Sequence, residues 1–210
     1  MNINEFESNY LNHYLALEDD FIKTIRYVSV SKDNYRTYSI EYLKQLLSIG
    51  SEIDVMKKLL AHLYAGRDVN DQDIVKTILN ADNNIQKIEV LLKPNNEILK
   101  PWDYVKEPDW WTAYNEIKHN RQDLAIKMNN NEKKYYQFAN LENTINALAG
   151  LLTLEFYAYR IVAINCNEKV FVPQIYSVFS VINSHWKDIP NGDGYVFLNE
   201  GLFLGKRFLF

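Results

Sequence analysis

The chain has 210 residues, of which 47% are hydrophobic and 14% aromatic, enough to bury a substantial core and to exclude a disordered protein. Its formal net charge of −4 at pH 7 excludes a general attraction to nucleic acid, so any such contact needs a local cluster of cations. The single cysteine, Cys166, excludes an intrachain disulfide and fits a reducing compartment.

Neither the start of the chain nor its longest uncharged stretch predicts a membrane or secretory segment. The first residues are acidic and have no apolar h-region, which argues against a secretory signal. Residues 170–186 are uncharged, but they include Pro173, Asn183 and His185 and fall short of a membrane span. We therefore expect a cytoplasmic protein that does not enter a membrane.

Helical spacing dominates the first half of the chain. Apolar side chains three and four residues apart predict helices over residues 7–28, 39–64 and 71–92. Gly66 is a plausible stop for the second helix, and the third must end before Pro94 because proline cannot continue a helix. The length of the second helix suits a bundle.

The next elements are an irregular connection, a fourth helix and a fifth. Residues 94–108 are proline-rich and predict a connection, after which Pro108 stiffens the entry to a helix and Asp109 can cap it. Residues 129–131 are three asparagines and predict a turn. Residues 135–164 are apolar nearly all the way round, which is typical of a central, buried helix.

The composition changes after Cys166, where glycines and aromatic residues gather. Residues 195–198 and 202–204 predict the two strands of a small hairpin around 199–201. We expect an all-α fold with two parts: a helical bundle domain over residues 1–165, and an aromatic-rich extension over 166–210 that packs on the bundle.

The fourth helix has two unlike faces. Each helical residue advances about 100°, so a polar face and an apolar stripe can be assigned directly. The polar face comprises Trp111, Asn115, His119 and Gln122. The apolar stripe comprises Trp110, Ala113, Ile117 and Leu124. Since a large aromatic on a polar face needs a cover, we expect Trp111 to meet a ligand or a second chain.

This polar face is the candidate site. His119 can exchange a proton near neutral pH, and Asn115 can orient a substrate oxygen or the imidazole. Lys118 and Arg121 lie beside them and could neutralise a phosphate. These residue types suit metal-independent cleavage of RNA, with His119 and Asn115 as catalytic residues and Lys118, Arg121 and Trp111 as substrate-binding residues.

Two other interpretations of the same residues stay open or are set aside. His119 and Asn115 can be ordinary surface polar groups, with Lys118 a solvated charge and Arg121 lying over the core. Glu116 and His119 also form a Glu-x-x-His pair, as in di-iron bundles, but the chain has no second copy of that motif. We therefore expect no metal and no cofactor.

The motif Trp-Trp-x-x-Tyr-Asn-x-x-Lys-His-x-Arg at residues 110–121 resembles bacterial proteins of the HEPN (higher eukaryotes and prokaryotes nucleotide-binding) type. Further similar stretches lie at residues 38–40, 51–54, 139–143 and 147–151. The resemblance implies a helical bundle, a homodimer, and a metal-independent ribonuclease of a toxin or phage-defence system, with RNA and an antitoxin or other protein as partners.

The signature of that family places an arginine a few residues before the histidine, and here the resemblance departs. His119 matches the histidine, but positions 112–114 hold Thr, Ala and Tyr, so the cation must come from Lys118, Arg121 or elsewhere. The leading hypothesis is a HEPN-like ribonuclease. The alternative is a noncatalytic HEPN-like module that binds RNA, a nucleotide or a partner protein.

Overall fold

The computed structural model describes residues 1–103, 107–166, 170–173, 178–183 and 194–197. The helices are α1 (Ile3–Phe6), α2 (Asn12–Ile25), α3 (Ile40–Ala65), α4 (Ile74–Ala81), α5 (Asp109–Asn120) and α6 (Leu141–Asn165), with a π-helical turn, Glu7–Leu11, joining α1 to α2. The strands are β1 (Glu89–Leu92), β2 (Glu97–Leu99), β3 (Val170–Pro173), β4 (Phe179–Asn183) and β5 (Gly194–Phe197). The predicted mainly helical fold is confirmed.

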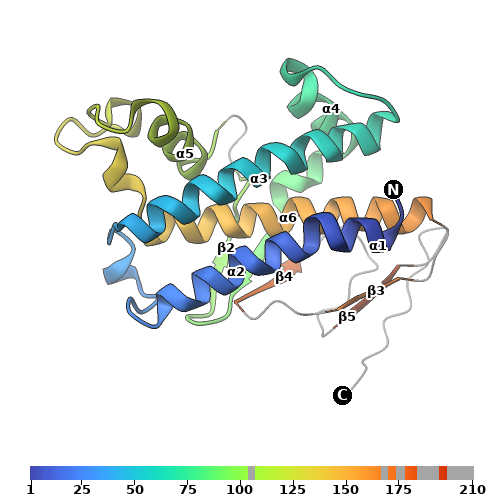
Figure 1. The fold of residues 1–210 in the computed structure, drawn as a ribbon, viewed down its shortest axis with the longest axis horizontal. Coiled ribbons are helices and arrows are strands. Elements are labelled where there is room, and N and C mark those ends of the chain that lie inside the picture. Colours follow the sequence, from blue (N-terminus) through green and yellow to red (C-terminus); the bar gives the residue numbers. More distant parts are fainter. Residues whose placement is uncertain (104–106, 167–169, 174–177, 184–193, 198–210) are drawn as a thin grey trace.

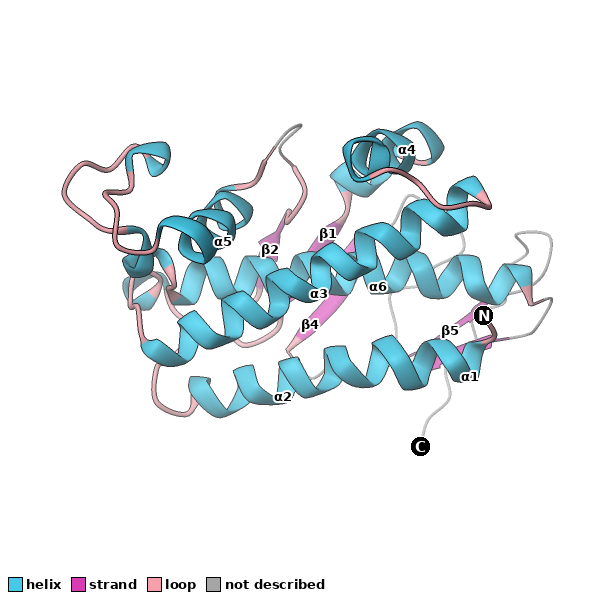
Figure 2. Cartoon of the chain, turned by 45° about the horizontal axis from the view of Figure 1, so that its top comes forward, coloured by secondary structure: helices cyan, strands magenta, loops and turns pink. Residues whose placement is uncertain are grey.

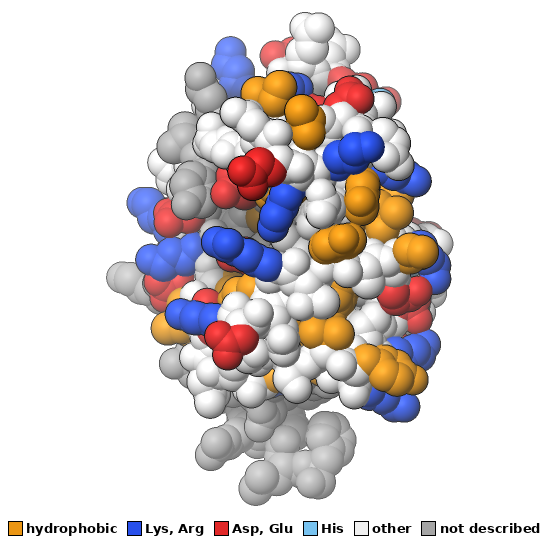
Figure 3. Space-filling model, turned by 90° about the vertical axis from the view of Figure 1, so that its left-hand side faces the viewer, with side chains coloured by type: hydrophobic (Ala, Val, Ile, Leu, Met, Phe, Trp, Pro, Cys, Tyr) orange, Lys and Arg blue, Asp and Glu red, His pale blue; other side chains and the backbone are white. Residues whose placement is uncertain are grey.

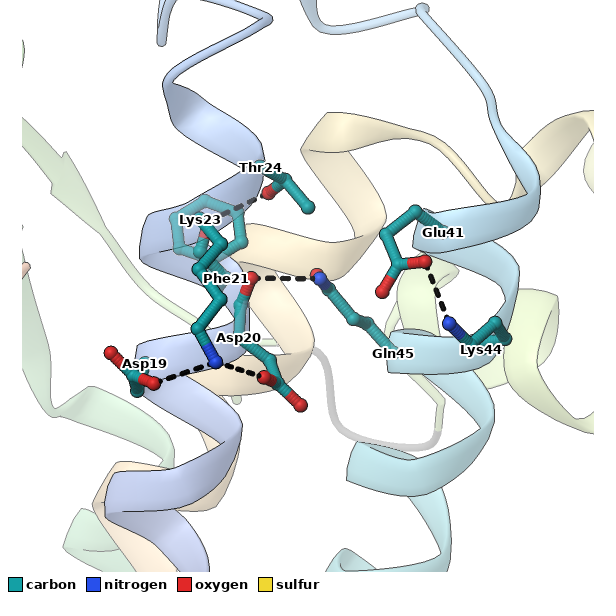
Figure 4. Close-up of polar contacts among 8 residues, drawn as sticks. All are labelled: Asp19, Asp20, Phe21, Lys23, Thr24, Glu41, Lys44 and Gln45. Atoms are coloured by element: carbon teal, nitrogen blue, oxygen red, sulfur yellow. Dashed lines mark hydrogen bonds and ion pairs between the residues drawn. The ribbon is translucent and has the colours of Figure 1, made fainter.

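The helices α3 and α6 run alongside each other through the middle of the molecule (Figure 1). The α1–α2 helix lies on one side of this pair, while α4 and α5 lie on the other side, near opposite ends (Figure 2). Figure 4 shows contacts between α2 and α3: Gln45 Nε2 donates to the Asp20 carbonyl at 3.1 Å, and Lys23 bridges Asp19 and Asp20 on the surface.

The second predicted helix, residues 39–64, is confirmed as α3, and its ends follow from its sequence. Ser39 Oγ accepts a hydrogen bond from the Tyr42 N–H at 3.0 Å, which caps the first turn. Gly66 adopts φ 66° and ends the helix in the left-handed conformation, as expected of a glycine in that position.

The central helix α6 is buried on nearly all sides. The predicted range 135–164 is confirmed except at its start, where residues Tyr135–Phe138 form a 3-10 turn and Asn140 caps α6 by accepting from the Asn143 N–H at 2.9 Å. Leu141–Asn165 is long and apolar enough to span a membrane, but 83% of its most apolar window is buried within the protein. It is therefore a core helix of this protein, while the cytoplasmic location stays a prediction.

The predicted helix over residues 71–92 is wrong in its second half. Helix α4 ends at Ala81, because Asp82 is extended and its carboxylate accepts from the Asn84 N–H at 3.0 Å. After a 3-10 turn, Asn83–Lys87, the chain enters β1, which pairs antiparallel with β2 and β4 in a three-stranded sheet, β2-β1-β4. The fold is therefore mainly helical, with a small antiparallel sheet beside the helices.

This sheet belongs to the same core as the helices. Val90 and Leu92 of β1 are fully buried, and they pair with Val181 and Phe179 of β4, which are also buried. The Val178 N–H donates to Glu18 Oε1 of α2 at 3.2 Å. Strand β4 lies within the predicted extension, residues 166–210, so part of that segment completes the core of the bundle.

The predicted C-terminal hairpin is described only in part. Residues 195–197 do lie in a strand, β5, but β5 pairs antiparallel with β3 in a two-stranded sheet. The expected partner strand, residues 202–204, and the turn at 199–201 lie outside the described residues.

One carboxylic acid is buried in the middle of α6. Glu155 is 1% exposed, and neither of its oxygens has a hydrogen-bond partner among the described residues. Burial raises the pKa of Glu155 well above its usual value, and the nearby Glu52 raises it further. Glu52 itself lies 3.0 Å from His13 Nδ1, so the buried acid lies behind a histidine–carboxylate contact near the surface.

Candidate functional site: a polar cavity beside the start of α5

Helix α5 has the apolar face that the sequence predicts, but only as far as the helix extends, to Asn120. Trp110, Ala113 and Ile117 are buried as predicted, and Tyr114 and Glu116 are buried with them. Two assignments are wrong, because α5 ends at Asn120: Gln122 and Leu124 lie beyond the helix, and Leu124 is 46% exposed. The expected cap is also wrong, since Asp109 is the first helical residue and Pro108 occupies the cap position.

The predicted catalytic pair lies on one side of α5, outside the two cavities that border the start of this helix. His119 is exposed and Asn115 is half-buried. Neither side chain makes a hydrogen bond within the described ranges, and neither lines either of the two cavities beside α5. Nothing in the described residues orients His119 for proton transfer, so its catalytic role stays a prediction.

The predicted cations lie at the same end of the helix. Lys118 is exposed, and its Nζ donates to the Tyr114 hydroxyl at 3.3 Å; that hydroxyl donates to Asp54 Oδ2 of α3 at 3.3 Å. Arg121 directly follows α5 and is exposed. The structure therefore brings Lys118, His119 and Arg121 together at the C-terminal end of α5.

Trp111 lies near the opposite end of α5, and this chain provides a cover for it. Lys57 Nζ of α3 lies 3.3 Å from the centroid of the Trp111 ring, and the Tyr114 ring lies 5.0 Å away. A lysine at this distance makes a cation–π contact. A ligand or a second chain is therefore not required to explain the half-buried indole.

A polar cavity of about 460 Å³ lies where the N-terminal ends of α5 and α6 meet. This volume falls within the range of about 300–1,000 Å³ typical of small-molecule sites. The lining comprises Arg36, Lys100, Pro101, Pro108, Asp109, Trp110, Met128, Asn130, Lys133, Gln137, Phe138, Asn140, Glu142, Asn143 and Asn146. These residues come from segments spread over much of the chain.

The basic residues of this cavity are mostly free of acidic partners. Lys100 pairs with Glu89 at 3.2 Å, whereas Arg36 and Lys133 make no ion pair within the described residues. Asp109 and Glu142 also line the cavity, each in the first turn of its helix. The site thus offers two available cations to a ligand.

Backbone hydrogen bonds fix the orientation of three amides in the lining. Asn130 Oδ1 accepts from the Lys133 N–H at 2.7 Å, Gln137 Oε1 from the Lys134 N–H at 2.9 Å, and Asn140 Oδ1 from the Asn143 N–H at 2.9 Å. With the oxygens occupied, the amide NH₂ groups have no partner among the described residues. Each supplies a donor to a ligand.

Two further amides are oriented the other way. The Asn143 NH₂ donates to the Phe138 carbonyl at 2.8 Å, and the Asn146 NH₂ donates to the Glu142 carbonyl at 2.9 Å. Their Oδ1 atoms are therefore the groups left to accept a hydrogen bond. The cavity combines cations, amide donors and amide acceptors, with Phe138 as an aromatic wall.

We also searched the described residues for side chains that could bind a metal ion. In the described part of the chain, no group of three His, Cys, Asp or Glu side chains could hold a metal ion. Glu116, the acidic member of the considered Glu-x-x-His pair, instead bonds to Lys127 Nζ through one oxygen and to Asn120 Nδ2 through the other.

The described residues at this end of the molecule form no broad basic patch. Figure 3, which views the end where α5 lies, shows basic, acidic and hydrophobic side chains interspersed. Binding of an anion here would therefore depend on the local set of cations in the cavity rather than on the field of the whole surface.

The sequence analysis found part of this cavity and missed the rest. It singled out residues 139–143, which contain Asn140 and Asn143, but gave no role to Arg36, Lys100 or Lys133. The Asn-x-x-Asn spacing is a usable signal, since the first asparagine caps a helix. Comparison of the chain with protein-family models, with curated proteins and with solved structures gave no match.

Proposed function

We propose that this protein is a noncatalytic, HEPN-like module that binds a nucleotide in the polar cavity. The observation that carries this proposal is the presence, in one cavity, of two cations without ion pairs and of three amide NH₂ groups without partners. Unpartnered donors and cations of this kind can be satisfied by an acceptor-rich ligand. A phosphate group meets that need.

The remaining lining suits the rest of a nucleotide. Asparagine and glutamine side chains pair with the edges of bases, and an aromatic ring such as Phe138 stacks on their faces. Asp109 and Glu142 can accept hydrogen bonds from ribose hydroxyls. We therefore assign Arg36 and Lys133 to the phosphate, and the amides to the base.

The test is titration calorimetry of the purified protein with AMP, ATP, adenosine and inorganic phosphate. We expect both nucleotides to bind more tightly than adenosine or phosphate alone, since each of those fills only part of the site. Arg36→Ala and Lys133→Ala should each weaken nucleotide binding by roughly tenfold, the loss of one charge-assisted contact.

Lys44→Ala is the matched control, because Lys44 is an exposed lysine on α3 paired with Glu41 at 2.7 Å. That variant should bind nucleotide as the wild type does. If no nucleotide binds at millimolar concentration, or if all three variants lose affinity equally, the cavity is not a nucleotide site.

The ribonuclease activity implied by the resemblance is a second candidate. The observation in its favour is that Lys118, His119 and Arg121 are all exposed at one end of α5, where an RNA backbone could reach them together. Incubation with total RNA and EDTA tests it. Cleavage that persists in EDTA and disappears in His119→Ala supports the enzyme, and intact RNA with the wild type excludes it.

The ribonuclease candidate includes a homodimer, in which α5 of a second copy completes the site around His119. Light scattering of the purified protein measures the mass directly. If the protein is a monomer at all concentrations, the ribonuclease candidate loses its dimer cleft. The proposal of nucleotide binding in the polar cavity would be unaffected.

A further inference from the structure

A second, smaller cavity lies between α3, α4 and α5. Its volume is about 140 Å³. Its walls are mostly apolar, and the lining comprises Lys57, Val75, Ile78, Leu79, Ile85, Gln86, Trp102, Glu107, Pro108, Trp111 and Leu154. Apolar cavities of about 150 Å³ accept a benzene-sized ring. The space therefore suits a small apolar or aromatic molecule.

Lys57 places an amine in this apolar setting. Its Nζ lies 3.3 Å from the centroid of the Trp111 ring and 5.4 Å from that of the Trp102 ring. Lys57 makes no ion pair within the described residues. The adjacent lysine, Lys58, differs in each respect: it is exposed, and its Nζ pairs with Asp71 Oδ1 at 3.0 Å.

The protonation of Lys57 reflects this environment. Burial lowers the pKa of the Lys57 amine to about 8, while Asp54 on the same helix and Glu107 beside α5 oppose the change. At pH 7.5 about a quarter of such an amine is neutral, against about one part in a thousand for an ordinary lysine. A neutral amine is the nucleophilic form.

We propose that Lys57 is a carbonyl-accepting lysine, and that the small cavity holds an apolar or aromatic aldehyde as an imine of its Nζ. The nitrogen lone pair adds to the carbonyl carbon, and a proton passes from nitrogen to oxygen to give a carbinolamine. Loss of that hydroxyl as water forms the C=N bond. Amine and aldehyde thus give imine and water, with no oxidant or reductant.

The geometry supports this step over simple binding of an anion. Glu107 lines the cavity and would repel a carboxylate ligand, whereas it does not oppose a neutral aldehyde. The side chains from α4, Val75, Ile78 and Leu79, provide apolar contact for the ring or chain attached to the carbonyl. The inference is independent of nucleotide binding, because the two cavities share only Pro108 in their lining.

The test is reductive trapping with benzaldehyde. Full-length protein is incubated with benzaldehyde and sodium cyanoborohydride, which reduces an imine to a stable secondary amine, and the modified lysines are located by peptide mass spectrometry. We expect Lys57 to be modified at least about tenfold faster than Lys58 at pH 7.5. The rate at Lys57 should level off above pH 8, while that at Lys58 keeps rising.

Lys57→Arg should remove this fast modification, and Lys58→Arg should leave it unchanged. Circular dichroism shows whether Lys57→Arg folds; if it does not, the ratio between the two sites in the wild type decides alone. Equal rates at Lys57 and Lys58, or rates that follow only the exposure of each lysine, would overturn the proposal.

Discussion

Two cavities border the start of α5, and they differ in both size and chemistry. The polar one measures about 460 Å³ and presents cations and amides, while the apolar one measures about 140 Å³ and presents a single lysine among aromatic and aliphatic walls. Pro108 lines both. The difference shows how one short helix can separate two environments with opposite requirements of a ligand.

The separation is made by two consecutive tryptophans. Trp110 lines the polar cavity and Trp111 the apolar one, because neighbouring helical residues point about 100° apart. Trp110 is 3% exposed and donates from Nε1 to the Pro101 carbonyl at 3.0 Å. The Trp-Trp motif therefore forms a wall between the cavities, with one indole in the core and the other at its edge.

The first prediction tests whether the two tryptophans are as unequal as their surroundings. Trp110→Ala should lower the free energy of unfolding by about 3–5 kcal/mol, since it leaves a large void and an orphaned Pro101 carbonyl. Trp111→Ala should cost about 1–2 kcal/mol, mainly the contact with Lys57. Urea denaturation followed by circular dichroism measures both. Equal losses of unfolding free energy in the two variants would contradict the difference in burial between the two indoles.

The second prediction concerns the glycines that let the aromatic side chains of α5 approach. A Cβ at Gly50 would lie 2.2 Å from the Tyr114 ring, and one at Gly150 would lie 3.0 Å from the edge of the Trp110 ring. Gly50→Ala should therefore cost about 1–3 kcal/mol by overpacking, and Gly150→Ala less. Thermal denaturation compares them, and the reverse order would contradict the close contact between α3 and α5.

The third prediction uses salt to distinguish the cavities. Raising the salt concentration from about 50 to 500 mM should weaken nucleotide binding in the polar cavity roughly tenfold by screening its cations. Trapping of benzaldehyde at Lys57 should change little, since a neutral aldehyde is not attracted by charge. Calorimetry and peptide mapping, run in the same buffers, give the two responses. A shared response would mean that the cavities are not chemically distinct.

The fourth prediction concerns pH and the apolar cavity alone. The pKa of Lys57 is lowered to about 8 in the folded protein, so the unfolded chain binds more protons between that value and the ordinary lysine pKa of about 10.5. Wild-type stability should therefore rise relative to Lys57→Met as the pH increases through this window. Urea midpoints at several pH values measure the difference, which should stay level if Lys57 titrates normally.

Local signals in the sequence predicted the helices well. Gly66 was predicted to stop the second helix, and α3 does end there. Ser39 and Asn140 were placed inside predicted helices, and each instead caps the helix that follows it. The burial of Trp110 and Ile117 followed from their spacing in the same way. Helix ends and helix faces depend on residues that are close together in the chain, so they can be predicted from one sequence.

Features that depend on residues far apart in the chain could not be predicted from local signals. The stretch from Ile85 to Leu92 has apolar residues at helical spacing, but pairing of β1 with β4, about ninety residues later in the chain, decides its conformation. The polar cavity likewise needs Arg36, Lys133 and Asn140 in one place, and nothing near any of them in sequence indicates the other two.

The buried acid in α6 makes folding itself a protonation reaction. At any pH between the ordinary carboxyl value and the raised pKa of Glu155, the folded protein holds a proton that the unfolded chain has released. Each molecule that folds in this range therefore removes a proton from the solvent, and the heat of refolding includes the ionisation heat of the buffer. Folding becomes less favourable as the solution grows more alkaline across that interval, as though the proton were a ligand of the native core.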